Sequence, residues 1–256
     1  MENLSVSIVI PCYNEENNLK NGVLDQVNQY LQKQKFTWEV LICNDESTDN
    51  SFRLVEDFSK KHSGFKVLNL PHGGKPSAVW GGIKSAKYPW VLFTDMDQST
   101  PLCELEKLIP YFNDYDFVIA SRGSTRHGAS LIRKLMAKTF LIFRKLFLLS
   151  DINDTQCGFK AIKTDLAKKL FPLLGYFHQH DNKGWRVSAF DVELLFMAQK
   201  AGYRIKEVLV NWKNEDISNT KGDDLKRFRK ESKQMIQEIW RVKINDLKGV
   251  YHDLQN

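Results

Sequence analysis

Short apolar runs alternate with longer amphipathic segments along the first hundred residues of the chain. Runs rich in Val, Ile and Leu predict strands, and segments with apolar residues three and four positions apart predict helices. The predicted strands are 6–11, 38–45, 65–71 and 90–95, and the predicted helices between them are 14–34, 48–62 and 75–87. Strands of this composition separated by helices are typical of a parallel sheet covered on both faces, so we expect an α/β fold.

The remaining pattern is more mixed, without an internal repeat or a linker rich in Pro and Gly. It predicts strands at 115–122 and 203–212, a loop entering a short strand at 151–163, and a helix at 189–202. We therefore expect one domain over residues 1–215, followed by a charged helical tail over 216–256.

Polar loops follow three of the predicted strands. They read PCYNEEN at 11–17, NDESTDNS at 44–51 and TDMDQSTP at 94–101. Loops at the carboxyl ends of parallel strands gather in one crevice, where the ligands of α/β sheets bind. Loops are polar in most proteins, but three acidic, turn-rich strand ends in succession favour a binding crevice.

Two carboxylates one residue apart, Asp95 and Asp97, end the fourth predicted strand. Like charges this close repel each other unless they are protonated or bridged by a cation. A hard divalent ion such as Mg²⁺ binds one or two carboxylates together with water and substrate phosphates. The pair therefore predicts a site for Mg²⁺ or Mn²⁺ and a diphosphate, although the same spacing occurs by chance in many loops.

A glycine-rich segment, PHGGKPSAVWGG at 71–82, follows the third predicted strand and enters a helix. Glycines allow the backbone to approach a ligand closely, and Lys75 adds positive charge at a helix start, where the dipole already favours anions. The Gly-x-x-x-x-Gly-Lys-Ser/Thr spacing of a nucleotide-hydrolysing P-loop is absent. This segment thus strengthens the prediction of a phosphorylated ligand.

The composition indicates a soluble protein with a preference for anionic partners. Of the 256 residues, 42% are hydrophobic and 27% charged, and the formal net charge is +6 with a pI near 9.0. The four cysteines form no Cys-x-x-Cys pair, and neither a signal peptide nor a membrane-spanning run is found. We expect a cytoplasmic protein, or one lying on a membrane surface. Nucleic-acid binding is not expected, because exposed stacking aromatics are not interleaved with the basic residues.

Seven segments, taken in order, resemble the motifs of the inverting glycosyltransferases of family 2. They are SIVIPCYNEENNL, NDESTDNS, HGGKPSAVWGGIKSA, VLFTDMDQSTP, SRGSTR, NDTQCGFKAI and FDVELLFMAQKAGYRIKEVLVNW. The resemblance runs from about Ser7 to Trp212 and is strongest to the branch that glycosylates polyprenyl phosphates such as dolichyl and undecaprenyl phosphate. It implies the GT-A fold, a mostly parallel central sheet with helices on both faces, and a UDP-sugar donor.

The resemblance also implies roles on the donor side. Asp95 and Asp97 match the motif that holds ribose, metal ion and diphosphate, and Asp45 matches the acid that contacts uracil. The other matches are Pro11, Tyr13 and Glu15 for the base and ribose, and Gly74 and Lys75 beside the nucleotide.

Three segments depart from the family pattern. The second loop reads Asn-Asp-Glu-Ser at 44–47 instead of Asp-Asp-Gly-Ser, and Pro76 stands where a further glycine is common. Gln98 replaces a leucine, alanine or glycine. The form of the second turn and the contacts to the sugar therefore stay open.

On the acceptor side, Arg122, Arg126 and Arg133 lie where relatives of the polyprenyl branch use arginines for the lipid phosphate. The planar guanidinium suits this task because it can grip a phosphate with two hydrogen bonds. A solvated basic loop is the alternative interpretation.

The next segment, 131–149, predicts a basic amphipathic helix. Lysine and arginine residues fall within one arc, and phenylalanine, leucine and isoleucine cover most of the opposite side. Such a helix is typical of the membrane interface, where it would place the protein at the inner face of the cell membrane. A helix packed on the core is also amphipathic, so both interpretations stand.

The implied reaction is attack by a polyprenyl phosphate oxygen on the anomeric carbon of a UDP-sugar, with inversion. By the resemblance, the two candidate catalytic residues are Asp154 and Asp191. Asp154 matches a motif placed near the donor in the polyprenyl branch, and we assign it to orienting acceptor and sugar. Asp191 stands at the position where hydroxyl-glycosylating relatives carry a base. Asp191 also fits a helix cap. Glucose is the expected sugar from the resemblance alone.

Two alternatives are a glycosyltransferase acting on a saccharide hydroxyl in capsule or wall synthesis, and a non-catalytic nucleotide-sugar-binding or membrane-adaptor subunit. The sequence leaves homo-oligomerisation and a membrane-protein partner open.

Overall fold

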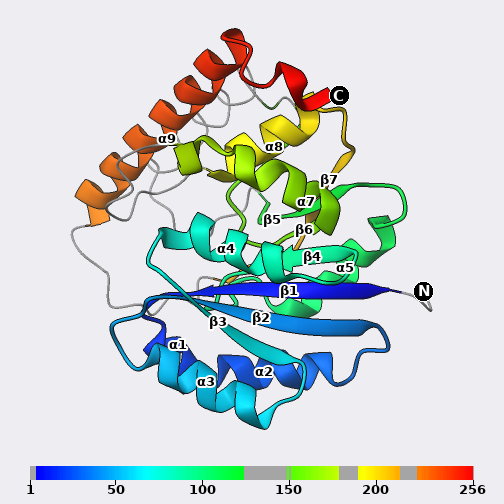
Figure 1. The fold of residues 1–256 in the computed structure, drawn as a ribbon, viewed down its shortest axis with the longest axis vertical. Helices are drawn as coiled ribbons and strands as arrows, with labels where there is room; N and C mark the ends of the chain where they lie inside the picture. The colour runs from blue at the N-terminus through cyan, green and yellow to red at the C-terminus, as the bar shows by residue number, and fades with distance from the viewer. Residues whose placement is uncertain (1–3, 124–148, 150, 179–189, 214–223, 256) are drawn as a thin grey trace.

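One mixed sheet forms the centre of the molecule (Figure 1). The computed structural model describes residues 4–123, 149, 151–178, 190–213 and 224–255. Within this part of the chain, seven strands pair in the order β3-β2-β1-β4-β6-β5-β7. They are β1 (Ser5–Cys12), β2 (Thr37–Asp45), β3 (Phe65–Leu70), β4 (Trp90–Phe93), β5 (Phe117–Ser121), β6 (Lys160–Lys163) and β7 (Ile205–Leu209). Only β6 runs antiparallel to its neighbours in this sheet, which confirms the predicted mostly parallel arrangement.

Helices cover both faces of the sheet, as predicted. In Figure 1 the helices α1, α2 and α3 lie below the sheet, and α4, α7 and α8 lie above it. The α-helices are α1 (Glu16–Lys20), α2 (Val23–Leu31), α3 (Ser51–Lys61), α4 (Gly74–Ser85), α5 (Leu105–Leu108), α7 (Thr164–Leu170), α8 (Phe190–Lys200) and α9 (Asp224–Leu247). Short 3₁₀ helices are η1 (Leu102–Glu104), η2 (Ile109–Tyr111), η3 (Phe171–Leu173), η4 (Gly175–His178) and η5 (His252–Gln255).

The predicted helix at 14–34 is wrong in one respect, because it is divided into α1 and α2. Gly22 lies between them with φ of 75°. This left-handed conformation is readily adopted by glycine and ends the first helix.

The central strands are mostly apolar because both of their faces are buried. In β1, Ile8 and Ile10 pack into the core on one face of the sheet, and Val9 packs into the core on the other. This alternation follows from the two-residue period of a strand. The edge strands β3 and β7 are less buried.

The carboxyl ends of β1, β2 and β4 meet at one edge of the sheet. Their parallel register aligns Cys12 with Asn44 and Val9 with Phe93. In the described part of the chain, the non-glycine residues with positive φ are Asn14, Glu46 and Gln98, one in each of the three following loops. A left-handed conformation costs such a residue about 1–2 kcal/mol, and strain of this kind gathers at functional sites.

The carboxyl-terminal helix α9 is part of the packed molecule. Its residues Ile239 and Val242 are buried in the same core as α8. The boundary predicted between residues 215 and 216 lies outside the described residues. Among the described helices, none has the length and apolar character that crossing a bilayer requires.

Candidate active site

Asp95, at the end of β4, lies between two other segments of the chain. Its carboxylate forms an ion pair with the ammonium of Lys75, at the start of α4. On another side it lies against Gly158, where a Cβ atom would come 2.6 Å from Cγ of Asp95. The glycine-rich segment and the 151–163 segment therefore both contact Asp95, the first residue of the acidic pair.

Lys75 is a cation in an acidic environment. Burial alone would lower the pKa of Lys75, but the carboxylates of Asp95, Asp191 and Asp97 together raise it. The lysine therefore stays charged and supplies positive charge beside the acidic pair. It is well placed to meet an anionic ligand there.

Asp45 closes the glycine-rich loop onto the end of β2. Its two carboxylate oxygens accept hydrogen bonds from the backbone N–H groups of Gly73 and Gly74, each at 2.8 Å. Nδ1 of His72 lies 3.0 Å from one of the same oxygens. The acid predicted to contact uracil thus also fixes the conformation of the loop before α4.

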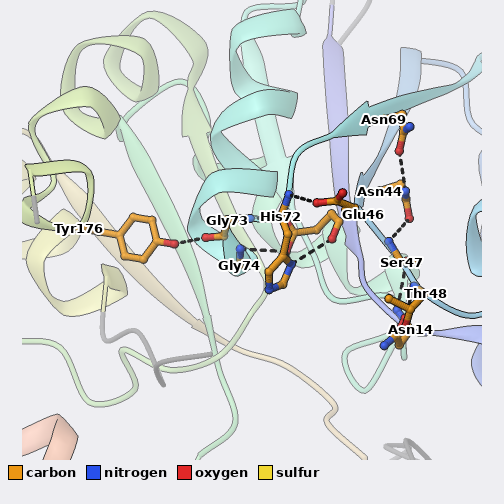
Figure 2. Close-up of polar contacts among 11 residues, drawn as sticks. Asn14, Asn44, Glu46, Ser47, Thr48, Asn69, His72, Gly73, Gly74 and Tyr176 are labelled. Atoms are coloured by element: carbon orange, nitrogen blue, oxygen red, sulfur yellow. Dashed lines mark hydrogen bonds and ion pairs between the residues drawn. The ribbon is translucent and has the colours of Figure 1, made fainter. Parts of the chain in front are cut away.

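Two side chains that the sequence analysis did not single out complete this arrangement. The hydroxyl of Tyr176, in η4, donates a hydrogen bond to the carbonyl of Gly73. Glu46, in its left-handed conformation, accepts a hydrogen bond of 3.0 Å from the backbone N–H of His72. Figure 2 shows Tyr176 reaching the loop from one side and Glu46 from the other.

The loop after β1 joins the same group. The ring of Tyr13 lies 4.7 Å, centroid to centroid, from the ring of His72. Asn14 accepts a 2.8 Å hydrogen bond from the backbone of Thr48. The backbone N–H of Glu15 donates to Ser51 at 2.7 Å. These contacts bring the first and second predicted loops together.

Pro11 lies in β1 beside Cys43 of β2, one residue before the strand ends.

The second acid of the pair, Asp97, is held in a tight turn. Its Oδ1 accepts a hydrogen bond from the backbone of Ser99 at 2.9 Å. Gln98, with φ of 50°, donates from its side chain to the backbone carbonyl of Asp95 at 2.8 Å. The residue that departs from the family pattern therefore stabilises the turn carrying both acids.

Arg122, predicted on the acceptor side, forms a bidentate ion pair with Asp154, predicted to orient acceptor and sugar. Nε and Nη2 of the arginine lie 2.7 and 2.8 Å from the two carboxylate oxygens. Burial alone would raise the pKa of Asp154, but hydrogen bonds and charge from Arg122 bring it well below its usual range. The guanidinium also lies 5.6 Å from the centre of the Trp212 ring. Asp154 therefore stays ionised and fixes the orientation of Arg122.

Asp191, in the first turn of α8, lies 2.8 Å from the ammonium of Lys160. The lysine side chain is fully buried, and its ammonium also donates to the carbonyl of Cys157. A buried charge is costly unless it is paired, so each of these two residues stabilises the other.

The remaining predictions on the acceptor side lie outside the described residues. These are Arg126, Arg133 and residues 131–148 of the predicted amphipathic helix.

Sequence reasoning missed several residues of the site. Lys160 left a detectable signal, because a lysine inside an apolar strand is unusual and needs a buried partner. Gly158 stands within a quoted motif but could not be linked to Asp95 without the fold. No sequence signal pointed to Tyr176, since it lies about a hundred positions from the loop it contacts.

The acidic pair fits a divalent metal ion that shares its ligands with a substrate. Mg²⁺ commonly takes one or two carboxylates and completes its shell with water and phosphate oxygens. Among the described residues, no group of three or more His, Cys, Asp or Glu side chains could enclose a metal by itself. The ammonium of Lys75 lies on Asp95 where a cation is expected. Asp95 and Asp97 are thus suited to a metal that arrives with a diphosphate.

Comparison with known proteins gives concordant results. Residues 7–171 match the family described as Glycosyl transferase family 2. A dolichyl-phosphate beta-glucosyltransferase of Dictyostelium discoideum is 31% identical over 269 aligned residues, covering 98% of this chain and 77% of the relative. The Drosophila melanogaster protein of the same name is 34% identical, covering 84% and 69%.

A solved structure supports the fold. The glucosyl-3-phosphoglycerate synthase of Mycobacterium tuberculosis, in complex with Mn²⁺, UDP and glucosyl-3-phosphoglycerate, superposes with a TM-score of 0.64 at 18% identity. The match covers 93% of this chain and 80% of that one. The predicted GT-A fold is thereby confirmed.

Proposed function

The chain belongs to glycosyl transferase family 2, and from this membership we propose that it transfers glucose from UDP-glucose to a polyprenyl phosphate, with inversion at the anomeric carbon. The relatives named dolichyl-phosphate beta-glucosyltransferases support both the sugar and the lipid class. The observation that carries the proposal is the position of Asp95, between Lys75 of the glycine-rich loop and Gly158 of the segment that carries Asp154. A donor diphosphate and an acceptor phosphate would there lie side by side.

On the donor side, we assign the nucleotide to the three loops at the sheet edge. Asp45 and Tyr13 would contact the base, with Pro11 and Glu15 near the base and ribose. The ammonium of Lys75, with Gly74 beside it at the start of α4, would pair with the diphosphate because both the charge and the helix dipole favour an anion.

A divalent ion held by Asp95 and Asp97 would stabilise the negative charge that develops on the departing UDP. Before the donor binds, Lys75 offsets the charge of Asp95. When the donor enters, the ammonium can turn to the diphosphate and leave both carboxylates to the cation. Lys75 thus allows the chain to hold the two carboxylates close together, because its positive charge offsets their mutual repulsion.

On the acceptor side, we assign the lipid phosphate to Arg122, with Arg126 and Arg133 as further ligands. A guanidinium has five N–H groups, so Arg122 can hold Asp154 and a phosphate at the same time. Asp154 would act by orienting this arginine. A phosphate oxygen is already ionised near neutral pH, so the attack needs no strong base, and we assign Asp191 to the sugar.

We place the protein at the cytoplasmic surface of a membrane, since its acceptor would be a lipid. Undecaprenyl phosphate is the polyprenyl phosphate to test first.

The direct test is incubation with UDP-glucose, Mn²⁺ and undecaprenyl phosphate in detergent micelles, followed by mass spectrometry of the lipid phase. A glucosylated lipid phosphate is expected, with one UDP released for each lipid formed. Parallel reactions with UDP-N-acetylglucosamine and UDP-galactose show which sugar the protein transfers.

Transfer to a saccharide hydroxyl but not to the lipid would refute the proposed polyprenyl phosphate acceptor. UDP binding in calorimetry, without turnover on any acceptor, would instead indicate a non-catalytic subunit.

A further inference from the structure

The carboxylate of Glu193, in α8, connects two parts of the molecule that are far apart in the sequence. The residue is buried, with 1% of its surface exposed. Arg241 of α9 donates to its two oxygens at 3.1 and 2.7 Å, and the hydroxyl of Tyr251 donates to it at 2.6 Å. The backbone N–H of Gly175, the first residue of η4, donates to the same carboxylate at 3.1 Å. Glu193 therefore holds α9 and η4 together.

The contact between η4 and α9 is also direct. At Gly175 an added Cβ would overlap Nη1 of Arg241 and lie 3.0 Å from its Cζ, whereas ordinary contacts of a Cβ begin at 3.4 Å. Gly175 is not among the glycines with positive φ, so the close approach, and not the backbone conformation, requires a residue without a side chain. A displacement of the guanidinium would therefore change the surroundings of η4.

The second residue of η4, Tyr176, contacts the glycine-rich loop. Its hydroxyl donates to the carbonyl of Gly73, as Figure 2 shows. Burial and the negative charge of Asp45 raise the pKa of Tyr176, so the hydroxyl keeps its proton and remains a donor. An added Cβ at Gly74 would lie 3.5 Å from the same oxygen. Tyr176 thus holds the loop immediately before Lys75.

The glycine-rich loop is held from two sides. On the side of β2, Asp45 and Glu46 accept hydrogen bonds from the loop backbone. On the other side, Tyr176 donates to the loop, and its neighbour Gly175 is bound to Glu193. The first set of contacts comes from a strand end of the candidate site, and the second leads to α9.

We propose that Arg241 is a positioning residue for the sugar-nucleotide donor. It holds Glu193, Glu193 holds η4, and η4 holds the loop that presents Lys75. The arginine touches no substrate and acts on donor affinity through the conformation of this loop. The identity of the donor rests on the proposed function, whereas the connection between α9 and the loop does not. Arg241 lies beyond residues 7–171, which match the family model, so the functional unit includes the carboxyl-terminal helix.

The expected effect is moderate because the loop has other contacts. Asp45 and Glu46 would still hold it from the side of β2. Leu174, just before η4, is fully buried and limits how far η4 can move. Loss of the grip on Glu193 should therefore weaken UDP binding about threefold, near the lower end of what one hydrogen bond contributes.

The test variant is Arg241→Lys in the full chain. Lysine keeps a positive charge beside the buried carboxylate but lacks the planar group that donates to both of its oxygens. Asp246→Asn is the matched control, because it also breaks an ion pair between α9 and α8. The partner in that pair, Lys200, is the last residue of α8 and lies about 10 Å along the helix from Glu193.

Three measurements are made on each protein. They are the dissociation constant of UDP in calorimetry with Mn²⁺, hydrogen–deuterium exchange of residues 71–82, and thermal unfolding. Arg241→Lys should bind UDP about threefold more weakly and exchange faster over 71–82, while Asp246→Asn should lose stability and keep wild-type affinity and exchange. Unchanged affinity and exchange in Arg241→Lys at a lowered melting temperature would overturn the proposal, and so would equal weakening in both variants.

A double-mutant cycle with Tyr176→Phe tests the route. In the Tyr176→Phe background, Arg241→Lys should change the affinity for UDP little, because the hydroxyl through which it acts is absent. A further threefold loss would show that the effect does not pass through Tyr176 and would overturn the proposal. If Arg241→Lys does not fold, Tyr251→Phe replaces it in the cycle, since it removes one hydrogen bond to Glu193 and leaves the ion pair in place.

The kinetics of transfer separate this inference from the proposed function. In Arg241→Lys, KM for UDP-glucose should rise about threefold with kcat little changed. If no protein glucosylates the lipid but UDP affinity follows the cycle, the proposed function fails and the positioning role stands. If Arg241→Lys transfers glucose with the wild-type KM, the positioning role fails and the proposed function stands. If wild type does not bind UDP, the donor assignment fails, and exchange over 71–82 alone shows whether Arg241 holds the loop.

Discussion

Replacing Gly158 by alanine is expected to disable the diphosphate side of the site while leaving the fold in place. An added Cβ would overlap Oδ2 of Asp95 and lie 2.6 Å from its Cγ, whereas ordinary contacts of a Cβ begin at 3.4 Å. Asp95 would have to move by about 1 Å to restore a normal contact distance. Gly158 is not among the residues with positive φ, so alanine adds no backbone strain of its own.

The size of the effect follows from this displacement. A shift of about 1 Å in a group that positions reacting atoms can cost about 100-fold in rate. This corresponds to about 2.7 kcal/mol of transition-state stabilisation. We expect kcat/KM to fall by about this factor and the Mn²⁺ concentration for half-maximal rate to rise, because Asp95 is an assigned metal ligand.

Initial rates of UDP release over a Mn²⁺ titration, together with thermal unfolding, measure both quantities. Gly202→Ala is the matched control, because Gly202 has φ of 81° and nothing within 4 Å of an added Cβ. It should lose about 1 kcal/mol of stability through backbone strain and keep the wild-type metal response. Wild-type rates and metal response in Gly158→Ala would refute the reasoning, and so would equal losses of activity in both variants.

Three further predictions concern single side chains of the site. Asp97→Ala should abolish metal-dependent turnover at a nearly unchanged melting temperature, since the side chain is only partly buried; normal rates would remove its assigned role. Tyr176→Phe removes the hydroxyl that donates to Gly73, so KM for the donor should rise about 3- to 10-fold with kcat little changed; an unchanged KM would show that the loop needs no such anchor. The pKa of Asp154 is depressed by Arg122. Its contribution to the free energy of unfolding is therefore complete above the unfolded value of about 4 and is lost as the pH falls below it. Urea unfolding at neutral and acidic pH should show a steeper loss for wild type than for Asp154→Asn, and parallel curves would contradict the assignment.

Much of the fold could be predicted because the central strands are buried on both faces. Such strands need continuous runs of Val, Ile and Leu, and β1 and β2 were predicted to within one residue of each end. The division between α1 and α2 was missed because one glycine interrupts an otherwise continuous helical pattern. The antiparallel direction of β6 could not be foreseen, since the pattern of a four-residue strand carries no direction.

The sequence predicts the residues of the candidate site but not their contacts with one another. Sequence motifs assigned Lys75, Asp95, Arg122 and Asp154 separately to the substrates. In the structure they bind one another in pairs, Lys75 with Asp95 and Arg122 with Asp154. Each pair joins segments 20 or more positions apart, and their distances depend on how the loops are placed by the sheet. A sequence pattern gives no information about distances between segments that are far apart in the chain.

The anchoring of α9 on Glu193 sets a limit on how far the protein can be shortened. Cutting the chain after residue 215, where composition suggests the end of the catalytic part, would remove both Arg241 and Tyr251. Glu193, in α8, the helix that also presents Asp191, would then lose its cationic partner and keep the hydrogen bond from the backbone N–H of Gly175. Removing the cationic partner of a buried carboxylate costs about 3–5 kcal/mol, a large part of the stability of a typical domain. A trimmed recombinant version is therefore expected to aggregate, so experiments on the carboxyl-terminal helix should substitute single residues instead of removing it.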